Sequence, residues 1–516
     1  MYQTQTRVKH LPNDEPPIFR LTTKLSIFGD SNGLGVVSEP KGNYKTNSPL
    51  LPGCPQIPTS LQLRSYQRQA ITNWFANNGR GTLKMATGSG KTITALAIAC
   101  ELYKQINLQV LLIVCPYRHL VTQWQRECQK FNLQPILAFE TARNWHNELS
   151  TQLYNINSGS QQFLTLITTN SSFMGESLRS QLKYLPERTL IIGDEAHNLG
   201  ATKLEESLPR AVGLRLGLSA TPERYFDEDG TRSLLDYFGE VLQPEFTLKD
   251  AINQGALVHY LYYPILVELT ESESITYSRL THKIGKALLY KERENLDLDS
   301  LEKAEDITYL LMQRARLIGA AENKLHALRE LMRNRHETTH TLFYCGDGSM
   351  ESSSVYTSHN QSNLHQLKEV ARILGTELNY RISTYTAQTS LTERESLRKQ
   401  FESGELQGLV AIRCLDEGID IPAIQTAVIL ASSSNPRQFI QRRGRVLRPH
   451  PGKERATIFD MIVLPPDLDR KTLEVERNLL KKELRRFVEF ADLADNSGEA
   501  RMKLFDLQKR YNLMDI

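Results

Sequence analysis

Apolar positions between Leu61 and about Pro244 form short runs that alternate with segments of helical spacing. The runs are predicted strands, at residues 82–86, 110–115, 164–168, 189–193 and 214–218. Strands that alternate with helices predict a parallel sheet covered by helices on both faces. In such sheets, ligands bind at the carboxyl ends of the strands.

A second alternating set comes later in the chain, with predicted strands at residues 341–345, 380–386, 408–412, 427–431 and 456–463. Between the two sets, residues 245–265 are predicted to form a connector. Residues 270–335 are predicted to form two or three helices, for which a plain helical spacer is the simplest interpretation. The fold class is therefore α/β, with two tandem domains built on parallel sheets.

These patterns predict five parts. They are an N-terminal extension (1–60), a first domain (61–245), a connector with a helical insertion (246–340), a second domain (341–468) and a helical C-terminal tail (469–516). The extension is rich in Pro, Gly, Asn and Ser, which favours extended chain, and residues 346–363 are predicted to form a loose loop. Ser390 and Glu393 form a capping box that opens a helix through Phe401, and Gly404 ends it.

Composition narrows the function classes. The 516 residues are 40% hydrophobic and 23% charged, with a net charge of +3, so any nucleic-acid footprint must be local. The six cysteines include no C-x-x-C pair, which favours a reducing cytoplasm and argues against a zinc or iron–sulfur site. Because no signal core or long apolar run is present, we expect a protein that is neither secreted nor membrane-spanning.

A phosphate-binding loop is predicted at Met85–Thr92, which reads M-A-T-G-S-G-K-T. Glycines let backbone N–H groups surround a polyphosphate, a lysine reaches the terminal phosphates, and a hydroxyl holds Mg²⁺. Met85 stands where the general P-loop pattern has glycine, so the loop fits the variant A-T-G-S-G-K-T. A glycine-rich turn without a ligand is the alternative, and the Lys-Thr pair opening a helix weighs against it. The predicted ATP-binding residues are Thr87, Gly88, Ser89, Gly90, Lys91 and Thr92, with Thr92 also a Mg²⁺ ligand.

Two acids, Asp194 and Glu195, end the predicted strand 189–193, and His197 follows them. Hydrolysis of a phosphoanhydride needs a metal to neutralise charge and a group to position the attacking water. We predict that Asp194 holds Mg²⁺, directly or through water, and that Glu195 takes the proton of the water. Alone, two acids would indicate a solvated strand end, but their place downstream of a phosphate loop favours function.

Two further motifs come after predicted strands. Ser219 and Thr221, after strand 214–218, could couple the acid pair to the second domain. Residues 438–448 form the densest basic cluster, in which Arg445 and Arg448 share a helix face and could reach one γ-phosphate. An arginine supplied across a domain boundary stabilises the charge of the transition state and raises the rate of phosphoryl transfer by roughly 10³–10⁵-fold in related systems. A general phosphate or nucleic-acid patch is the alternative.

The order of these motifs resembles superfamily 2 helicases and translocases of the DEAH-box type, over residues 61–465. The segments that carry the resemblance are 64–67, 86–92, 115–120, 167–170, 194–197, 219–221, 415–420 and 441–448. Tyr66-Gln67, Arg314-Ala-Arg316 and Asp416–Pro422 resemble the XPB-like and restriction-enzyme motor branch more than RNA-dedicated DEAD-box proteins. The run from Tyr344 to Pro449 also resembles the helicase-like protein of phosphorothioate-linked DNA restriction.

The resemblance implies two RecA-like domains that clamp ATP at their interface and move on nucleic acid. It implies that Gln67 reads the adenine edge, with Arg64 beside it. Gly418 and Asp420 would lie near the ribose and the γ-phosphate, and Gln441 would bridge to the attacking water and the acid pair. Arg445 and Arg448 would be the arginine fingers.

Nucleic-acid contacts are implied by the same resemblance, at Arg118, Gln123, Thr168, Thr169 and Arg413. Contacts with phosphates fix the register of a protein on nucleic acid without reading bases, as a sequence-independent motor requires. Thr168 and Thr169 could instead simply finish a strand. Related RNA-type enzymes usually carry a threonine near the end of this strand, at the place where Ile412-Arg413 stands in this sequence. The charge of Arg413 could replace the hydrogen bond that the threonine makes with a phosphate. We expect Trp124 to be a core anchor rather than a platform for base stacking.

The sequence contains no PD-x-D/E-x-K, H-N-H or His/Cys metal-binding pattern, so a restriction or repair role would need a separate nuclease as partner. The leading hypothesis is an ATP- and Mg²⁺-dependent DNA helicase or translocase that acts on duplex or branched DNA. An RNA helicase with the same core, and a nucleotide-gated clamp within a nuclease complex, are the alternatives.

Overall fold

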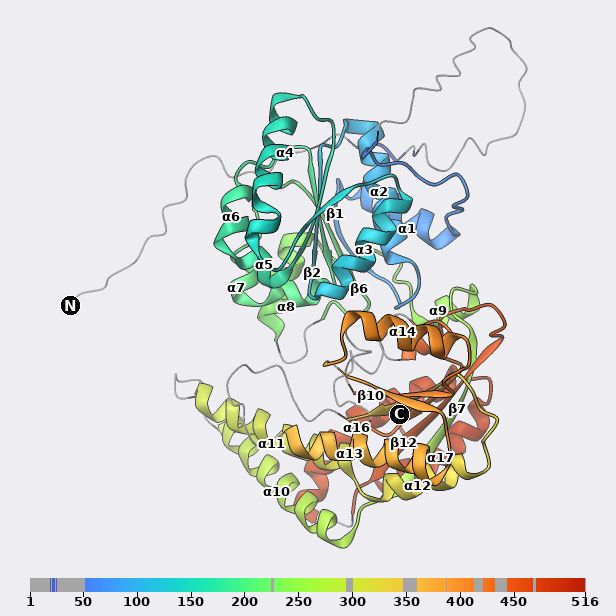
Figure 1. The fold of residues 1–516 in the computed structure, drawn as a ribbon. Coiled ribbons are helices and arrows are strands. Elements are labelled where there is room, and N and C mark those ends of the chain that lie inside the picture. The colour runs from blue at the N-terminus through green and yellow to red at the C-terminus, as the bar shows by residue number, and fades with distance from the viewer. Residues whose placement is uncertain are drawn as a thin grey trace, which may run out of the picture. The chain divides into compact units, whose positions relative to one another are not determined.

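The protein forms two compact units, residues 1–248 and 249–516, in a computed structural model (Figure 1). The structure describes residues 19, 21–23, 25, 52–223, 227–293, 300–346, 360–386, 388–412, 421–431, 443–466 and 470–515. Most of the predicted N-terminal extension and of the predicted loop 346–363 lies outside these residues.

The first unit contains a six-stranded parallel sheet. Its order is β1 (Arg80–Lys84), β6 (Leu214–Ser219), β5 (Thr189–Asp194), β2 (Val110–Cys115), β4 (Leu164–Thr169) and β3 (Pro135–Ala138). The five predicted strands are confirmed, although β1 lies two residues earlier than predicted. The short strand β3, which begins at a proline, was not predicted from the sequence. Beyond β1, the Thr82 and Ala86 N–H groups donate to Glu240 and Phe246 carbonyls, so residues 240–246 cover this edge.

Helices cover both faces of this sheet, which explains why β2, β4, β5 and β6 are buried along their whole length. One face carries α1 (Ser65–Ala76), α2 (Lys91–Ile106) and α3 (Arg118–Lys130). The other carries α4 (His146–Ser158), α5 (Asn170–Met174), α6 (Glu176–Leu182), α7 (Thr202–Glu205) and α8 (Glu228–Phe238) (Figure 1).

The second unit repeats this topology. Its parallel sheet has the order β7 (His259–Glu268), β12 (Arg455–Leu464), β11 (Thr426–Ile429), β8 (Thr341–Cys345), β10 (Gly408–Ile412) and β9 (Ile382–Tyr385). Numbered along the chain within each sheet, the strands of both sheets have the order 1-6-5-2-4-3. The predicted pair of α/β domains is therefore confirmed.

The prediction of a connector at 245–265 is wrong for β7, which pairs with β12 from His259 to Glu268. The strand contains Pro264, which is tolerated because β7 lies at the edge of the sheet. On its outer side, the Asn496 side chain accepts from Tyr262 N–H at 2.8 Å and donates to Tyr262 C=O at 3.0 Å. The N–H of Asp495 donates to the carbonyl of Tyr260.

Helices of the second unit agree with the predicted pattern. The insertion contains α10 (Glu271–Arg293), α11 (Ser300–Ala320) and α12 (Asn323–Arg333), and the C-terminal part contains α16 (Arg470–Asp492) and α17 (Ser497–Arg510). Three other helices of this unit are α9 (Leu248–Asn253), α13 (Asn360–Arg372) and α14 (Leu391–Glu402). At the start of α14, the Ser390 hydroxyl accepts from Glu393 N–H, which confirms the Ser390 half of the predicted capping box.

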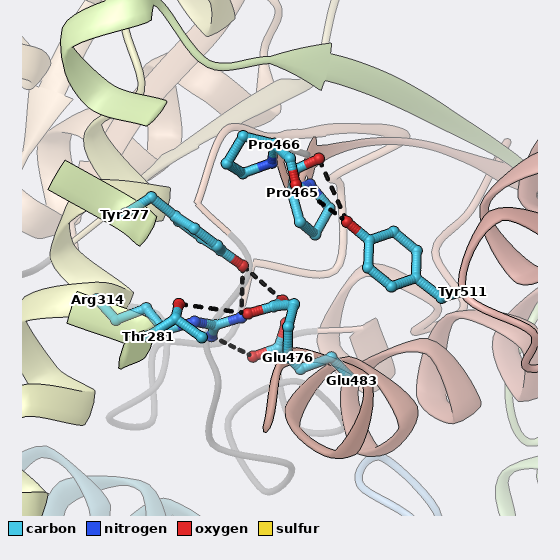
Figure 2. A network of polar contacts seen from close by, with 8 residues as sticks. All are labelled: Tyr277, Thr281, Arg314, Pro465, Pro466, Glu476, Glu483 and Tyr511. Atoms are coloured by element: carbon cyan, nitrogen blue, oxygen red, sulfur yellow. Dashed lines mark hydrogen bonds and ion pairs between the residues drawn. The ribbon is translucent and has the colours of Figure 1, made fainter. Parts of the chain in front are cut away.

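A buried polar network joins the insertion to the C-terminal helices (Figure 2). Arg314 Nη2 on α11 donates to Glu476 Oε1 on α16 at 2.9 Å and to the Tyr277 hydroxyl on α10 at 2.7 Å. That hydroxyl donates to Glu476 Oε1 at 2.6 Å, and Arg314 Nη1 also reaches Glu483. Removal of one partner would leave an uncompensated buried charge, so the tail is an integral part of this unit.

Candidate active site

The polar strand ends of the first unit lie along one edge of its sheet. The register pairs Lys84 with Ser219 and Asp194 with Leu218. The Met85 N–H group donates to the Ser219 carbonyl at 3.1 Å. The predicted phosphate loop, acid pair and Ser219 therefore lie at the ends of the neighbouring strands β1, β5 and β6, where parallel sheets bind ligands.

The phosphate loop connects β1 directly to α2, which begins at Lys91. Gly88 and Gly90 both have a φ of 86°, in the left-handed region that favours glycine. A Cβ atom at Gly90 would lie only 2.7 Å from the Gln67 side chain. The two glycines therefore allow a tight turn that leaves the N-terminal N–H groups of α2 at the loop.

Side chains of the loop supply further donors. Thr87 and Ser89 are 6% and 2% exposed, and their buried hydroxyls have no hydrogen-bond partner among the described residues. A buried hydroxyl without a partner is costly, so these positions fit the oxygens of a phosphate. Lys91 Nζ donates to the Met85 carbonyl at 3.0 Å and contacts the Ala86 carbonyl at 3.4 Å, so the ammonium lies across the loop.

The start of α1 fastens the loop from the outside. The Tyr66 hydroxyl donates to the Ser89 carbonyl at 2.6 Å, and its ring stacks on Phe246 with centroids 3.8 Å apart. Burial raises the pKa of Tyr66, which keeps the hydroxyl a donor. Gln67 Nε2 donates to the Gly90 carbonyl at 3.3 Å, and its Oε1 accepts from Arg64 N–H. The proposed adenine-reading residue thus also contacts the phosphate loop, whereas no role was predicted for Tyr66 in supporting it.

The acid pair is held in a defined geometry. Asp194 ends β5, and Glu195 comes next with φ 45° and ψ 52°, a strained conformation for a residue other than glycine. Glu195 N–H donates to Asp194 Oδ1 at 3.0 Å, and the Trp124 indole donates to Asp194 Oδ2 at 2.8 Å. Trp124 is 1% exposed, which confirms its prediction as a core anchor. Its contact with the acid pair was not predicted.

The predicted coupling residues also come together. His197 Nδ1 lies 3.1 Å from Ser219 Oγ and 3.6 Å from Glu195 Oε2. Ser219 Oγ in turn accepts from Thr221 N–H at 3.1 Å. A chain of polar contacts therefore runs from Glu195 through His197 and Ser219 to Thr221.

The nucleic-acid residues predicted in the first unit differ in their exposure. Arg118 opens α3 with a side chain that is 70% exposed, and its ion pair with Glu140 contributes little to stability at this exposure. Thr169 is the N-cap of α5 and accepts from Ser172 N–H. Thr168 is fully buried, and its hydroxyl donates to the Ala138 carbonyl at 2.8 Å, so it is used within the sheet.

The basic cluster of the second unit contains a buried residue. Arg443 pairs with Asp460 on β12 and lies over the Phe490 ring, 4.9 Å from its centroid. Arg445 and Arg448, the two predicted fingers, are only partly buried. Among the described residues of the cluster, Arg443 thus has a structural role, which the sequence pattern did not distinguish from the roles of Arg445 and Arg448. The predicted site residues Arg413, Gly418, Asp420 and Gln441 lie outside the described residues.

A lysine after this cluster holds it in place. Lys453 Nζ donates to the Val446 and Arg448 carbonyls at 2.6 and 2.9 Å. Burial, with the charge of Arg448, lowers the pKa of Lys453 to about 8. Its position in a short Pro-Gly turn carried no sequence signal for this role.

The described cysteines are free: Cys54, Cys100, Cys115, Cys128 and Cys345. Burial, together with the charge of Asp194, raises the pKa of Cys115 well above its ordinary value. Among the described residues, we find no group of three or more His, Cys, Asp and Glu side chains that could hold a metal ion. In the same part of the chain, no helix is long and apolar enough to cross a membrane.

Known families match both units. The "Type III restriction enzyme, res subunit" family matches residues 60–224, and the "Helicase conserved C-terminal domain" family matches residues 323–450. The chain is 27% identical over 417 residues to the DNA 3'-5' translocase XPB2 of Sulfurisphaera tokodaii, covering 76% of this chain and 80% of that protein. It is 26% identical over 411 residues to the DNA 3'-5' helicase XPB of Mycobacterium tuberculosis, covering 79% of this chain and 62% of that protein.

Among solved structures, the fold resembles the ATP-dependent Type ISP restriction-modification enzyme LlaBIII bound to DNA. That match has a TM-score of 0.53 and 19% identity, and it covers 85% of this chain and 31% of that one. The two matching families fall in separate units, in the same order as the motifs. The chain is therefore an ATP-hydrolysing enzyme with the two domains of a helicase, and it is similar to the superfamily 2 helicases and translocases of the XPB-like and restriction-enzyme motor branch.

Proposed function

We propose that this protein is a DNA helicase or translocase that couples ATP hydrolysis to movement on DNA, in restriction, defence or repair. The observation that carries the proposal is the row of strand ends that brings the phosphate loop, the acid pair and Ser219 to one sheet edge. The relatives described above, a DNA 3'-5' translocase and a DNA 3'-5' helicase, support DNA as the substrate.

The nucleotide part of the mechanism uses residues of the first unit. The hydroxyl of Thr92 and the carboxylate of Asp194 are oxygen donors of the kind that Mg²⁺ prefers. When bound, Mg²⁺ supplies neutralisation of the phosphate charge. Lys91 moves from the loop carbonyls to the γ-phosphate, and the hydroxyls of Thr87 and Ser89 donate to phosphate oxygens. Glu195 takes the proton from the attacking water.

The chain of contacts through His197 supports coupling. A change in the charge or position of Glu195 during hydrolysis would alter its interaction with His197, and through Ser219 it would reach the Thr221 backbone. Binding of ATP and of nucleic acid would then affect each other reciprocally. Replacement of Ser219 by Ala should lower nucleic-acid stimulation more than basal hydrolysis, and equal losses would contradict the coupling role.

From the second unit, we assign the finger role to Arg445 and Arg448, supported by the family resemblance and by the anchoring of their segment through Arg443 and Lys453. By the same resemblance, Gln441, Gly418 and Asp420 complete the nucleotide site. R448A should keep ATP affinity and lose much of the rate. Arg455→Ala, which removes an exposed arginine paired with Asp495, is the control and should leave the rate unchanged.

The nucleic-acid track is proposed to include Arg118, Gln123, Thr168, Thr169 and Arg413. Thr168 would act through its backbone or through strand geometry, because its hydroxyl is used within the sheet. Contacts with phosphates predict binding that is independent of sequence and weakens with salt. Cleavage of DNA is assigned to a separate nuclease partner.

The decisive experiment measures ATP hydrolysis with single-stranded DNA, duplex DNA, branched DNA and RNA, with K91A as background. We expect duplex or branched DNA to stimulate hydrolysis more than RNA does. Selective stimulation by RNA would overturn the choice of DNA in favour of an RNA helicase. Stimulation by DNA without strand or triplex displacement would overturn movement in favour of a nucleotide-gated clamp.

A further inference from the structure

The indole of Trp124 makes a contact that packing alone does not require. Its N–H group donates to Asp194 Oδ2 at 2.8 Å, between residues that lie seventy positions apart in the chain. The indole of Trp74, in the same unit, makes a different kind of hydrogen bond. Trp74 is 0% exposed and donates to the backbone carbonyl of Arg215 at 3.1 Å. A buried indole can therefore be satisfied by a backbone carbonyl, whereas Trp124 donates to a carboxylate.

The two donors to Asp194 fix its orientation. Oδ1 accepts from Glu195 N–H and Oδ2 from Trp124, so rotation of the carboxylate breaks at least one hydrogen bond. A carboxylate has about four acceptor sites, so two N–H donors are compatible with a metal ligand. Partners that orient metal ligands in this way commonly change metal affinity or activity by about 10–100-fold when they are removed.

The helix that carries Trp124 also carries two of the proposed nucleic-acid contacts. Val121, Trp124 and Cys128 form the buried stripe of α3 against the sheet. Arg118 begins the same helix with an exposed side chain, and Gln123 precedes the tryptophan. Any displacement of this short helix would therefore move the indole relative to Asp194.

We propose that Trp124 is a positioning residue that orients Asp194 for Mg²⁺ and makes α3 the element through which bound nucleic acid changes ATP hydrolysis. The link to nucleic acid rests on the function proposed above, whereas the orientation of Asp194 does not. The W124F variant keeps most of the buried ring surface and removes the N–H donor. Trp74→Phe is the matched control, because it removes an equally buried donor away from the acid pair.

The first test measures the binding of a fluorescent ADP analogue across a magnesium titration. In W124F, the Mg²⁺ concentration that gives half of the maximal gain in affinity should rise about tenfold or more. In W74F this Mg²⁺ concentration should stay within about twofold of the wild-type value, because Trp74 does not contact the metal ligand and distant sites act nearly independently. An unchanged Mg²⁺ dependence in W124F, or an equal shift in both variants, would overturn the positioning role.

The second test compares ATP hydrolysis with and without duplex DNA at saturating Mg²⁺. W124F should lose most of the stimulation that the wild-type protein shows, and W74F should retain it. Full stimulation in W124F would overturn the role of α3 as the link. If no nucleic acid stimulates the wild-type protein, the proposed function fails, while the magnesium titration still decides the positioning role.

A third measurement does not depend on the folding of W124F. The wild-type protein is labelled with 5-fluorotryptophan, and the signals of its three tryptophans are assigned by elimination with W74F and Trp145→Phe. Adding Mg²⁺ to the ADP-bound protein should shift the Trp124 fluorine signal more than the other two. A Trp124 signal that does not respond would contradict the proposal.

Discussion

The two sheets share one topology and differ in the residues that come directly after their strands. In the first unit, β1 leads into the phosphate loop, β5 into Asp194 and Glu195, and β6 into Ser219. At the equivalent positions of the second unit, β7 leads within two residues into α10, β11 into the buried Leu430 and Ala431, and β12 into two prolines. The fold determines where strands end, and the residues at those ends determine the chemistry.

Removal of one polar side chain after the first strand of each sheet should have opposite consequences in the two units. K91A should lower ATP hydrolysis by at least about 10²–10³-fold, because the ammonium no longer neutralises the γ-phosphate. Thr270→Ala, after β7, removes a hydroxyl near the start of α10 and should leave hydrolysis unchanged. Steady-state ATPase assays on both variants decide the matter, and equal losses would contradict the assignment.

An acid can be compared between the units in the same way. E195Q should still bind ATP but hydrolyse it about 10²–10⁴-fold more slowly, because the amide cannot accept the proton of the water. Glu273→Gln is the control at the start of α10, where the carboxylate accepts from Thr270 N–H and Glu322 N–H. Nucleotide binding and single-turnover hydrolysis should separate the variants. Normal turnover in E195Q would remove Glu195 from the role of base.

The second unit contains a titratable group in its core that should make its stability depend on pH. Lys324 is fully buried and donates to the Ile318 carbonyl at 2.6 Å, and burial lowers its pKa to about 7. The unfolded chain therefore binds more protons than the folded one between pH 7 and about 10. As the pH rises from 7 to 9, the free energy of unfolding should increase by about 2 kcal/mol from this group.

The check is denaturant unfolding of the wild-type protein and of Lys324→Met at both pH values, monitored by a probe of the second unit. The increase in the free energy of unfolding between pH 7 and 9 should be about 2 kcal/mol smaller in the variant than in the wild-type protein. Lys453, whose lowered pKa also makes the free energy of unfolding increase with pH, is present in both proteins and does not affect this difference. An identical rise in the two proteins would show that Lys324 is not the group responsible.

The smallest expected effect concerns the support of the phosphate loop. Tyr66→Phe removes the hydrogen bond to the Ser89 carbonyl but keeps the stack on Phe246. A hydrogen bond of this kind contributes about 1 kcal/mol, so the KM for ATP should rise roughly fivefold. Tyr103→Phe is the control. It removes a hydroxyl on α2 that donates to the Gln162 side chain, away from the phosphate loop, and it should not change the KM for ATP. A KM that is equal in the two variants would argue against the support role.

The strands that the sequence predicted to the residue are β2, β8 and β10, because buried central strands read as uninterrupted apolar runs. The strand β7 was missed because alternating burial and Pro264 resemble a connector. The motifs of the active site were predictable because each of them is a short, contiguous stretch of the sequence. The Trp124–Asp194 contact was not, because it depends on how α3 packs on the face of the sheet. Likewise, composition alone cannot show that Arg443 is buried whereas Arg445 is partly exposed.

The Asn496 side chain and the Asp495 backbone, which complete the hydrogen bonds of Tyr260 and Tyr262, have a practical consequence for fragments of this protein. A truncation that ends after β12 would expose the outer edge of β7 over several residues. An open, flat strand edge is a template for pairing with another copy, and the end result is aggregation. The segment between α16 and α17 therefore caps this edge, and a shortened version for crystallisation should retain both C-terminal helices.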